Sequence, residues 1–408
     1  MALTVDVSPS LGENDYFYKY IQYFGKIMLK FTCFYQYIGG CLMHFRLSLT
    51  LLSCLAFMLY LPNQASAAGN QALVNQIKTE YRTYDAAIKN QYRTDESTIK
   101  AAYQQFDSQV KADYNQLKNI ATSHYNQLKD KYSSNEMDEL YGEIYRSGLA
   151  LDVYYGEVYR SGLALDQYYG QVYRSGLPLD QYYGEVYRSG LALDRYYGEV
   201  YRTSLTLDTY ERQGGNAATL KQKFASIKSA ANQSLTSKRK AALESVQAAR
   251  TAAIKTVCQT KLETIRKLVA VEKELTGKET DYGTFGIDGL CNEPLIVKVD
   301  KNELNLSPAA TMVQGTPFVP IKPIYEALGA TVTWNQADQS ITVTAGSTNA
   351  VLRVNQKQAF VNGAAIPLNA PVQIIQGAAM MPVSFLENSL GADVMVNLSI
   401  RVIHINTK

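Results

Sequence analysis

The apolar positions of residues 70–135 recur every 11 residues along three lines. One line holds Tyr81, Tyr92, Tyr103, Tyr114 and Tyr125, a second holds Ile77, Ile88, Ile99 and Val110, and a third holds Tyr84, Phe106, Leu117 and Leu128. Their offsets put all three lines on one stripe of a helix, and a period of 11 is typical of a straight or slightly right-handed coiled coil. Because such an apolar stripe needs a partner, the pattern predicts a coiled-coil helix over residues 68–135.

The same period returns in residues 213–276. The positions that carry it are Phe224, Leu235, Val246, Val257 and Leu268, with Ala231, Ala242 and Ala253 beside them. Two helices of about 60 residues would each be about 90 Å long. The matched period and length suggest that they pack together as an antiparallel hairpin.

Between these helices, residues 136–212 contain five near-identical copies of a 14-residue unit, such as YGEVYRSGLALDQY at residues 155–168. Copies this similar indicate recent duplication, so the copy number is expected to vary without harm. Apolar residues recur every seven positions, as at Val158, Leu165 and Val172, which favours a left-handed coiled-coil helix. Two glycines in most units and Pro178 oppose a helix. Short β-arcs turned at Ser-Gly, or disorder, are the alternatives.

Residues 295–408 contain one pattern written twice, 62 positions apart. Val319-Pro320 recurs as Met381-Pro382, Gln314-Gly315 as Gln376-Gly377, and Leu328-Gly329-Ala330 as Leu390-Gly391-Ala392. In the first copy the pattern predicts a short helix between Pro320 and Gly329, because proline suits a first helical turn and glycine a helix end. A β-hairpin follows at residues 331–344, with Trp334 expected in the core. We therefore predict an α+β module of two tandem half-units, joined to the preceding helix by a Gly-rich linker over residues 277–294.

The line FVPIKPIYEALGATVTW at residues 318–334 closely resembles the copper amine oxidase N-terminal-like domain, or stalk domain, of Gram-positive envelope proteins. The resemblance covers about residues 296–408 and implies a non-catalytic surface module without copper chemistry. The second half departs from the family pattern: Ser384 stands where the family has Arg, Asn388 replaces Glu, and Val396 replaces Trp. In the first half, Lys322 and Glu326 form an opposite-charge pair four residues apart.

The front of the chain favours export. Residues 47–61 form an apolar run that is short for a membrane span, and Ala65-Ser66-Ala67 follows as a signal-peptidase pattern. We expect cleavage after Ala67, so that residues 1–67 are a signal peptide; Met43 would start a leader of ordinary length. A retained anchor and a lipoprotein site at Cys54 are the alternatives. The mature chain is then secreted, with no membrane span.

Charge is divided unevenly, since residues 136–212 carry 13 acidic and 7 basic side chains, and residues 216–278 carry 4 and 13. The second long helix is therefore basic, with Lys238, Arg239 and Lys240 as its densest cluster. These residues are a candidate site for an anionic polymer such as teichoic acid or DNA. The simpler interpretation is a solvated face, or one balanced by acidic repeats folding back on it.

Candidate chemistry is sparse. The mature chain has two histidines, His124 and His404, and two cysteines, Cys258 and Cys291. None of them has metal-ligand spacing, so we expect no metal, no cofactor and no catalytic residue, and the sequence leaves open whether the cysteines pair. Repeated carboxylates also argue against catalysis, because an active site needs one constellation of groups.

Taken together, these patterns predict a secreted, non-enzymatic structural or interaction protein of the bacterial envelope. A coiled-coil stalk would carry a module that contacts a wall polymer or an envelope protein, and the coiled coil could also self-associate. Dense tyrosine supports this, since 15 of the 31 tyrosines lie in residues 141–210 and tyrosine suits adhesive or carbohydrate-stacking surfaces. For Tyr154 and its equivalents, packing in the helix seam is the favoured alternative. Binding of an anionic polymer, with nucleic acid the less favoured ligand, and a role as accessory to an envelope hydrolase are the alternatives.

Overall fold

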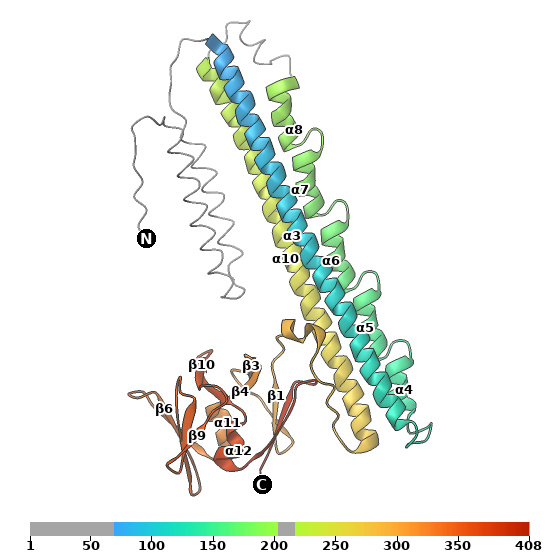
Figure 1. Ribbon diagram of the computed structural model, residues 1–408, viewed down its shortest axis with the longest axis vertical. Coiled ribbons are helices and arrows are strands. Elements are labelled where there is room, and N and C mark those ends of the chain that lie inside the picture. The colour runs from blue at the N-terminus through green and yellow to red at the C-terminus, as the bar shows by residue number, and fades with distance from the viewer. Residues whose placement is uncertain (1–68, 203–216, 408) are drawn as a thin grey trace, which may run out of the picture. The chain divides into compact units, whose positions relative to one another are not determined.

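The computed structural model describes residues 69–202 and 217–407, and residues 70–408 form one compact unit (Figure 1). Long helices come first and a β-rich module of three sheets follows, which confirms the predicted α+β class. The predicted signal peptide, the cleavage site at Ala67 and the alternative start at Met43 lie outside the described residues. Among the described helices, none is both long and apolar enough to cross a membrane.

Helices α3 (Gly69–Leu128) and α10 (Ala217–Thr276) each contain 60 residues and run in the same direction. Their side chains meet in pairs that are 148 residues apart in the sequence. These pairs are Glu80 with Lys228, Tyr84 with Asn232, Asp113 with Lys261, and His124 with Glu272. A constant separation requires parallel helices, because partners in an antiparallel pair would have a constant sum of residue numbers. The hypothesis of an antiparallel hairpin is therefore wrong.

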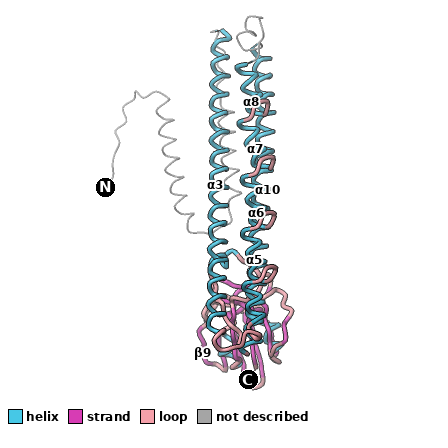
Figure 2. The backbone as a smooth tube through the Cα atoms, turned by 90° about the vertical axis from the view of Figure 1, so that its right-hand side faces the viewer, coloured by secondary structure: helices cyan, strands magenta, loops and turns pink. Residues whose placement is uncertain are grey.

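The repeats explain the parallel arrangement, because they run back along both long helices (Figures 1 and 2). They form α4 (Asp138–Tyr145), α5 (Ala150–Tyr159), α6 (Ala164–Tyr173), α7 (Pro178–Tyr187) and α8 (Ala192–Tyr197), followed by the π-helix η1 (Gly198–Arg202). Helix α10 packs against all five short helices. The acidic repeats thus fold back on the basic helix, as the charge pattern suggested.

Each described repeat is helical, but the helix is broken once per unit. Helices α5, α6 and α7 have 10 residues each, and the glycine of the next Ser-Gly turn, such as Gly162 with φ of +84°, is left-handed. Glycine adopts this conformation without a steric penalty. The seven-residue line is still buried, with Val158 and Leu165 each 3% exposed. For the described repeats, the helical interpretation is confirmed, while the β-arcs and an unbroken coiled coil are wrong.

One repeat advances along the bundle by the same distance as one 11-residue period of α3. Successive repeats each place a buried tyrosine against one tyrosine of α3, with ring centroids 5.1–5.6 Å apart. The pairs are Tyr154 with Tyr114, Tyr168 with Tyr103, Tyr182 with Tyr92, and Tyr196 with Tyr81. Each step is 14 residues in the repeats and 11 in α3, or about 16.5 Å along the helix axis. The turn in each unit takes up the three extra residues.

Two irregularities of the third repeat compensate each other. In three other repeats a glutamate accepts a hydrogen bond from the backbone N–H of an alanine seven residues later, as Glu157 does from Ala164 at 2.9 Å. Pro178 stands at the alanine position and has no N–H to donate, but it suits the first turn of α7. Gln171 stands at the glutamate position and instead accepts the hydroxyl of Ser245 on α10 at 2.7 Å. The replacement of glutamate by glutamine therefore accompanies the proline.

The C-terminal module consists of three sheets and two short helices (Figure 1). Its elements are β1 (Ile296–Val299), β2 (Asn302–Leu304), β3 (Thr311–Val313), β4 (Thr316–Pro320), α11 (Ile321–Ala327), β5 (Thr331–Asn335), β6 (Ser340–Ala345), β7 (Thr348–Arg353), β8 (Gln358–Val361), β9 (Ala364–Pro367), β10 (Gln373–Ile375), β11 (Ala378–Pro382), α12 (Phe385–Leu390), β12 (Asp393–Asn397) and β13 (Val402–Asn406). The sheet orders are β12-β13-β1-β2, β10-β11-β4-β3 and β5-β6-β7-β8-β9.

The two half-units meet about a local two-fold axis. Strands β4 and β11 pair antiparallel with Val319 opposite Met381, and these residues are the equivalents found 62 positions apart. Each half also contributes a hairpin to the sheet of the other: β1 pairs with β13, and β8 joins the sheet of β5 and β6 through β7. This exchange binds the halves into one core, in which Val319, Met381 and Ile403 have no exposed surface.

The linker is fastened to α10 by a disulfide between Cys258 and Cys291, whose Cα atoms are 5.5 Å apart. Next to it, the 3₁₀-helix η2 (Gly286–Leu290) covers a buried ion cluster. Lys261 Nζ lies 2.9 Å from Asp113 Oδ1 and 2.8 Å from Asp288 Oδ1. Burial raises the pKa of the Asp113 carboxyl, and the Lys261 ammonium opposes the rise. The cluster thus joins α3, α10 and the linker.

Candidate functional site

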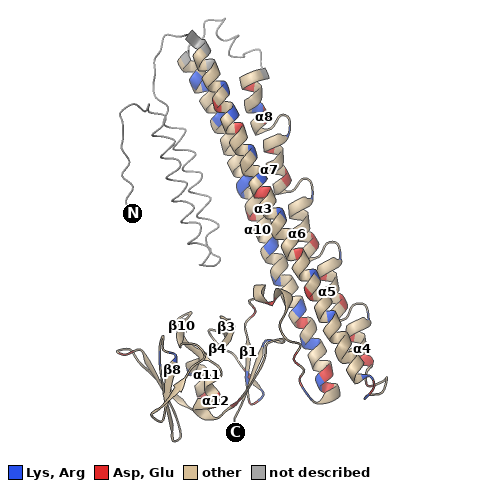
Figure 3. Cartoon of the chain, in the orientation of Figure 1, with Lys and Arg blue, Asp and Glu red and all other residues tan. Residues whose placement is uncertain are grey.

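The basic cluster predicted from the sequence lies on α10, a helix with Lys and Arg along its length (Figure 3). Arg239 of this cluster faces α3. The Arg239 guanidinium donates two hydrogen bonds to Asp95 of α3, at 2.6 and 3.0 Å. Lys238 Nζ donates to Gln181 of the repeats at 3.1 Å, while Lys240 is exposed. Polyanion binding by this cluster stays a prediction, and Lys240 is the member that presents most of its charge to solvent.

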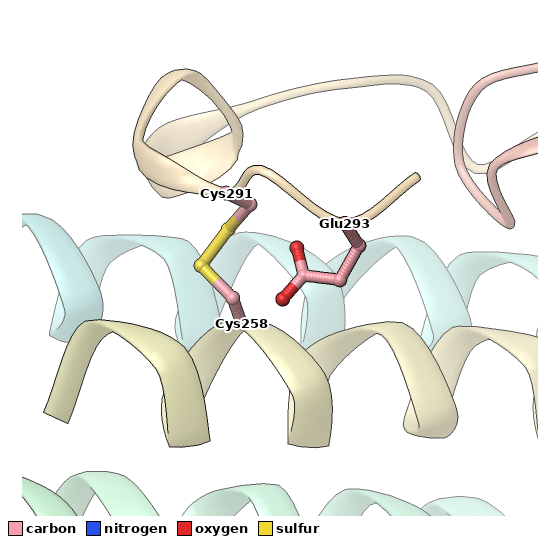
Figure 4. A group of neighbouring side chains, drawn as sticks. All are labelled: Cys258, Cys291 and Glu293. Atoms are coloured by element: carbon pink, nitrogen blue, oxygen red, sulfur yellow. A yellow bond between two sulfur atoms is a disulfide. The ribbon is translucent and has the colours of Figure 1, made fainter. Parts of the chain in front are cut away.

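One group of potential metal-binding side chains, formed by Cys258, Cys291 and Glu293, occurs among the described residues (Figure 4). The two sulfur atoms are bonded to each other. A cysteine binds metal as a thiolate, so the oxidised pair supplies no sulfur ligand. The group is therefore a structural bridge between α10 and the linker.

A groove of about 700 Å³ lies between the first half of the C-terminal module and strands β10 and β11 of the second half, and it is the candidate binding site. Strand β5 contributes Val332 and Trp334, which are two residues apart and so lie on one face of the strand. Helix α11 contributes Lys322, and β10 contributes Ile374. Strands β5 and β10 are edge strands of their sheets. The backbone N–H and C=O groups on their outer edges therefore form no ladder hydrogen bonds within these sheets.

Trp334 is 45% exposed, so the expectation that it belongs to the core is wrong. The physical reason is that β5 lies at the edge of its sheet, where four of its five residues are exposed. The indole Nε1–H donates to Gln336 Oε1 at 2.8 Å, which restrains the ring. Ile374 is 51% exposed, and its apolar side chain likewise lines the groove.

The second half-unit uses the corresponding hairpin differently. Its turn docks on α10 and the linker: Arg266 Nε of α10 donates to the Ile400 carbonyl at 3.1 Å, and the backbone N–H of Tyr282 in the linker donates to Ser399 Oγ at 3.1 Å. Ile400 is 6% exposed and belongs to the same apolar cluster as the helices. In the first half, the turn beside Trp334 keeps residues 335–339 largely exposed. The module therefore has one hairpin fastened to the bundle and one available to a ligand.

Lys322 adds a positive charge to the groove. It is exposed, and its Nζ lies 3.8 Å from Glu326, which confirms the predicted pair. In the second half, Ser384 stands at the position of Lys322 and Val396 at the position of Trp334. Neither the positive charge nor the indole is therefore repeated at these positions. The sequence signal for this site was the difference between the halves; the sequence did not indicate Ile374, because its side of the groove forms only in the folded module.

Residues 298–405 match the family model described as copper amine oxidase N-terminal domain. This match confirms the resemblance inferred from residues 318–334, and it covers the module but not the helices. Domains of this family are common in surface proteins and are typically non-catalytic. The matched residues contain a single histidine, His404. No curated protein matches the chain.

Proposed function

We propose that this chain is a secreted, non-catalytic interaction protein of the bacterial cell envelope. Its helical bundle carries the C-terminal module, and the module binds a wall polymer or an envelope protein in the groove beside Trp334. The leader-like residues 1–67 support export, and the matched domain supports a surface role. The exposed indole in the groove carries the proposal.

A tryptophan that is 45% exposed offers a ligand a large apolar ring system with one polar N–H. Ligand sites combine apolar and aromatic walls with a few polar groups that set orientation. Here Trp334 and Ile374 supply the apolar walls, while Lys322 and Gln336 supply the polar groups. An elongated ligand suits an open groove between two sheet edges better than a compact metabolite does.

We expect Trp334→Ala to weaken binding of the chain to purified cell walls by about 30-fold, since central aromatic residues of interfaces contribute about 2 kcal/mol or more. Sedimentation with walls measures this loss. Met395→Ala is the matched control, because Met395 is 52% exposed on β12, the equivalent strand of the second half. Equal binding by Trp334→Ala and Met395→Ala would remove the groove from the proposal.

The same sedimentation assay separates the groove from the basic cluster. Binding that falls steeply between about 50 and about 200 mM salt is the sign of contacts with a polyanion. A loss of that kind, together with weakened binding by Lys238→Ala and Lys240→Ala, would assign wall contact to α10 instead.

A further inference from the structure

The repeats carry a second set of tyrosines on the outside of the bundle, which we call the tyrosine ladder. Each rung is a pair of tyrosines four residues apart, with ring centroids 4.8–5.0 Å from each other. The rungs are Tyr141 with Tyr145, Tyr155 with Tyr159, Tyr169 with Tyr173, Tyr183 with Tyr187, and Tyr197 with Tyr201. The central rungs expose about two-fifths of each ring, as in Tyr155 (39%) and Tyr169 (40%).

These tyrosines are distinct from the ones that build the core. In four of the five rungs the residue just before the first ring is a tyrosine of the bundle core, at most 2% exposed: Tyr154, Tyr168, Tyr182 and Tyr196. Both tyrosines of a rung instead make edge-to-face contacts with one tyrosine of α3. The ring centroids of Tyr169 and Tyr173, for example, lie 5.8 and 5.5 Å from that of Tyr103. The rungs are thus held in place before any ligand arrives, which lowers the entropy cost of binding.

The rungs are evenly spaced, because each is set by one 11-residue period of α3, or about 16.5 Å. A row of identical sites at constant spacing suits a polymer that presents the same unit repeatedly. Several weak contacts along one chain then combine into a much higher overall affinity.

The charged groups of the ladder are balanced. An arginine guanidinium lies over the first ring of each of four rungs, at 5.4–5.9 Å from the ring centroid, and an aspartate eight residues earlier pairs with it. In one rung, Arg174 donates to Asp166 at 2.6 Å. On α3, Lys100 pairs with Glu96 beside the same rung. A polyanion such as nucleic acid requires uncompensated cations, so this surface favours an uncharged polar partner.

We propose that the tyrosine ladder binds a linear, uncharged polysaccharide. Sugar rings offer C–H faces for the tyrosine rings, and their hydroxyls match the phenol, guanidinium and carboxylate groups of each rung. The ladder lies on the helical repeats and the groove lies on the C-terminal module, so this site is independent of the one beside Trp334.

Titration calorimetry of the full secreted chain with linear uncharged oligosaccharides of increasing length tests the proposal. An N-acetylated chito-oligosaccharide series and a linear glucan series are the probes, and alginate is the acidic comparison. We expect affinity to rise once the oligosaccharide is long enough to reach a second rung. A variant with serine at Tyr155, Tyr159, Tyr169 and Tyr173 should bind about tenfold more weakly. Trp334→Ala should bind the oligosaccharides as the natural chain does, even if the groove has no ligand.

Replacing the same four tyrosines by phenylalanine keeps the rings and guards against loss of folding. This variant should stay folded and keep the length dependence, but it should bind several-fold more weakly because it lacks the phenol hydroxyls that meet the sugar hydroxyls. If the serine variant unfolds, unchanged affinity of the phenylalanine variant would overturn the proposal. The proposal is overturned if no uncharged oligosaccharide binds, if affinity is independent of length, or if only alginate binds. It is also overturned if the ladder is buried by a second copy, seen as a self-association in sedimentation velocity that the phenylalanine variant retains and that excludes oligosaccharide.

Discussion

A chain that lacks residues 169–182, one complete repeat unit, is expected to melt about 10–20 °C below the intact protein. The four remaining repeats, each of which advances by about 16.5 Å, cannot cover the same length of the two long helices. Ile77, Tyr81 and Phe224, now at most 7% exposed, lie near the end of the bundle that would lose its cover. Exposure of each such side chain costs about 1.5–3 kcal/mol, and about 1 kcal/mol shifts the melting temperature of a domain this large by about 2–4 °C.

The matched control removes the same repeat together with residues 96–106 of α3 and 244–254 of α10. Each long helix then loses one full 11-residue period, so the remaining stripes keep their phase and both Asp95–Arg239 and Asp113–Lys261 keep their partners. We expect this triple deletion to melt near the temperature of the intact chain, as followed by far-ultraviolet circular dichroism. If the repeat-only deletion is as stable as the triple deletion, the registers are not coupled. The expectation from sequence that copy number varies freely would then stand.

Replacing Lys261 by methionine is expected to destabilise the protein by about 3–5 kcal/mol, because it leaves a buried carboxylate without its counter-charge. Asp113 is fully buried and would keep two donors, the Tyr154 hydroxyl at 2.7 Å and the backbone N–H of Ile287 at 2.9 Å. The free energy of unfolding, measured in urea, gives the loss. Lys240→Met is the surface control and should change stability by less than about 1 kcal/mol.

A double variant, Lys261→Met with Asp113→Asn, should recover part of that loss, since it removes the stranded charge. The sign of the pH dependence provides a further check. Burial already raises the folded-state pKa of Asp113 in the natural chain, and loss of the Lys261 ammonium raises that pKa further. The folded variant therefore holds the proton to higher pH and gains more stability than the natural chain as pH falls. The gap between Lys261→Met and the natural chain should therefore narrow in acid. A gap that is small at neutral pH would show that the cluster contributes little.

The direction of the long helices illustrates what a sequence period can and cannot predict. The lines through Tyr81 and Phe224 correctly identified the buried faces of α3 and α10. The spacing of an apolar stripe is the same in both chain directions, however. The period therefore carried no information on whether the two helices run parallel or antiparallel. The repeats decided this by returning the chain to the starting level of α3, which left the parallel arrangement as the one available.

The repeats show a similar division. Their seven-residue line predicted which side chains are buried, such as Val158 and Leu165. The break at Gly162 was not predicted, because the same Ser-Gly pair can end a helix or turn a strand. Contact with α3 selects the broken helix, since only a unit with one turn in 14 residues advances by the rise of 11 helical residues. Pro178 then occupies a first turn and not a helix interior.

By itself the sequence determined the local elements of this protein: the apolar stripes of the long helices, the buried seven-residue line of the repeats, the two half-units and the family that the module resembles. Those follow from side-chain periodicity and turn chemistry, which act over a few residues. Only the tertiary structure decided the parallel course of α3 and α10, the Cys258–Cys291 bridge and the exposure of Trp334. Each of these features depends on which element covers which face. Asp113 and Lys261, for example, are 148 residues apart in the sequence and meet because the repeats return the chain to the start of α3.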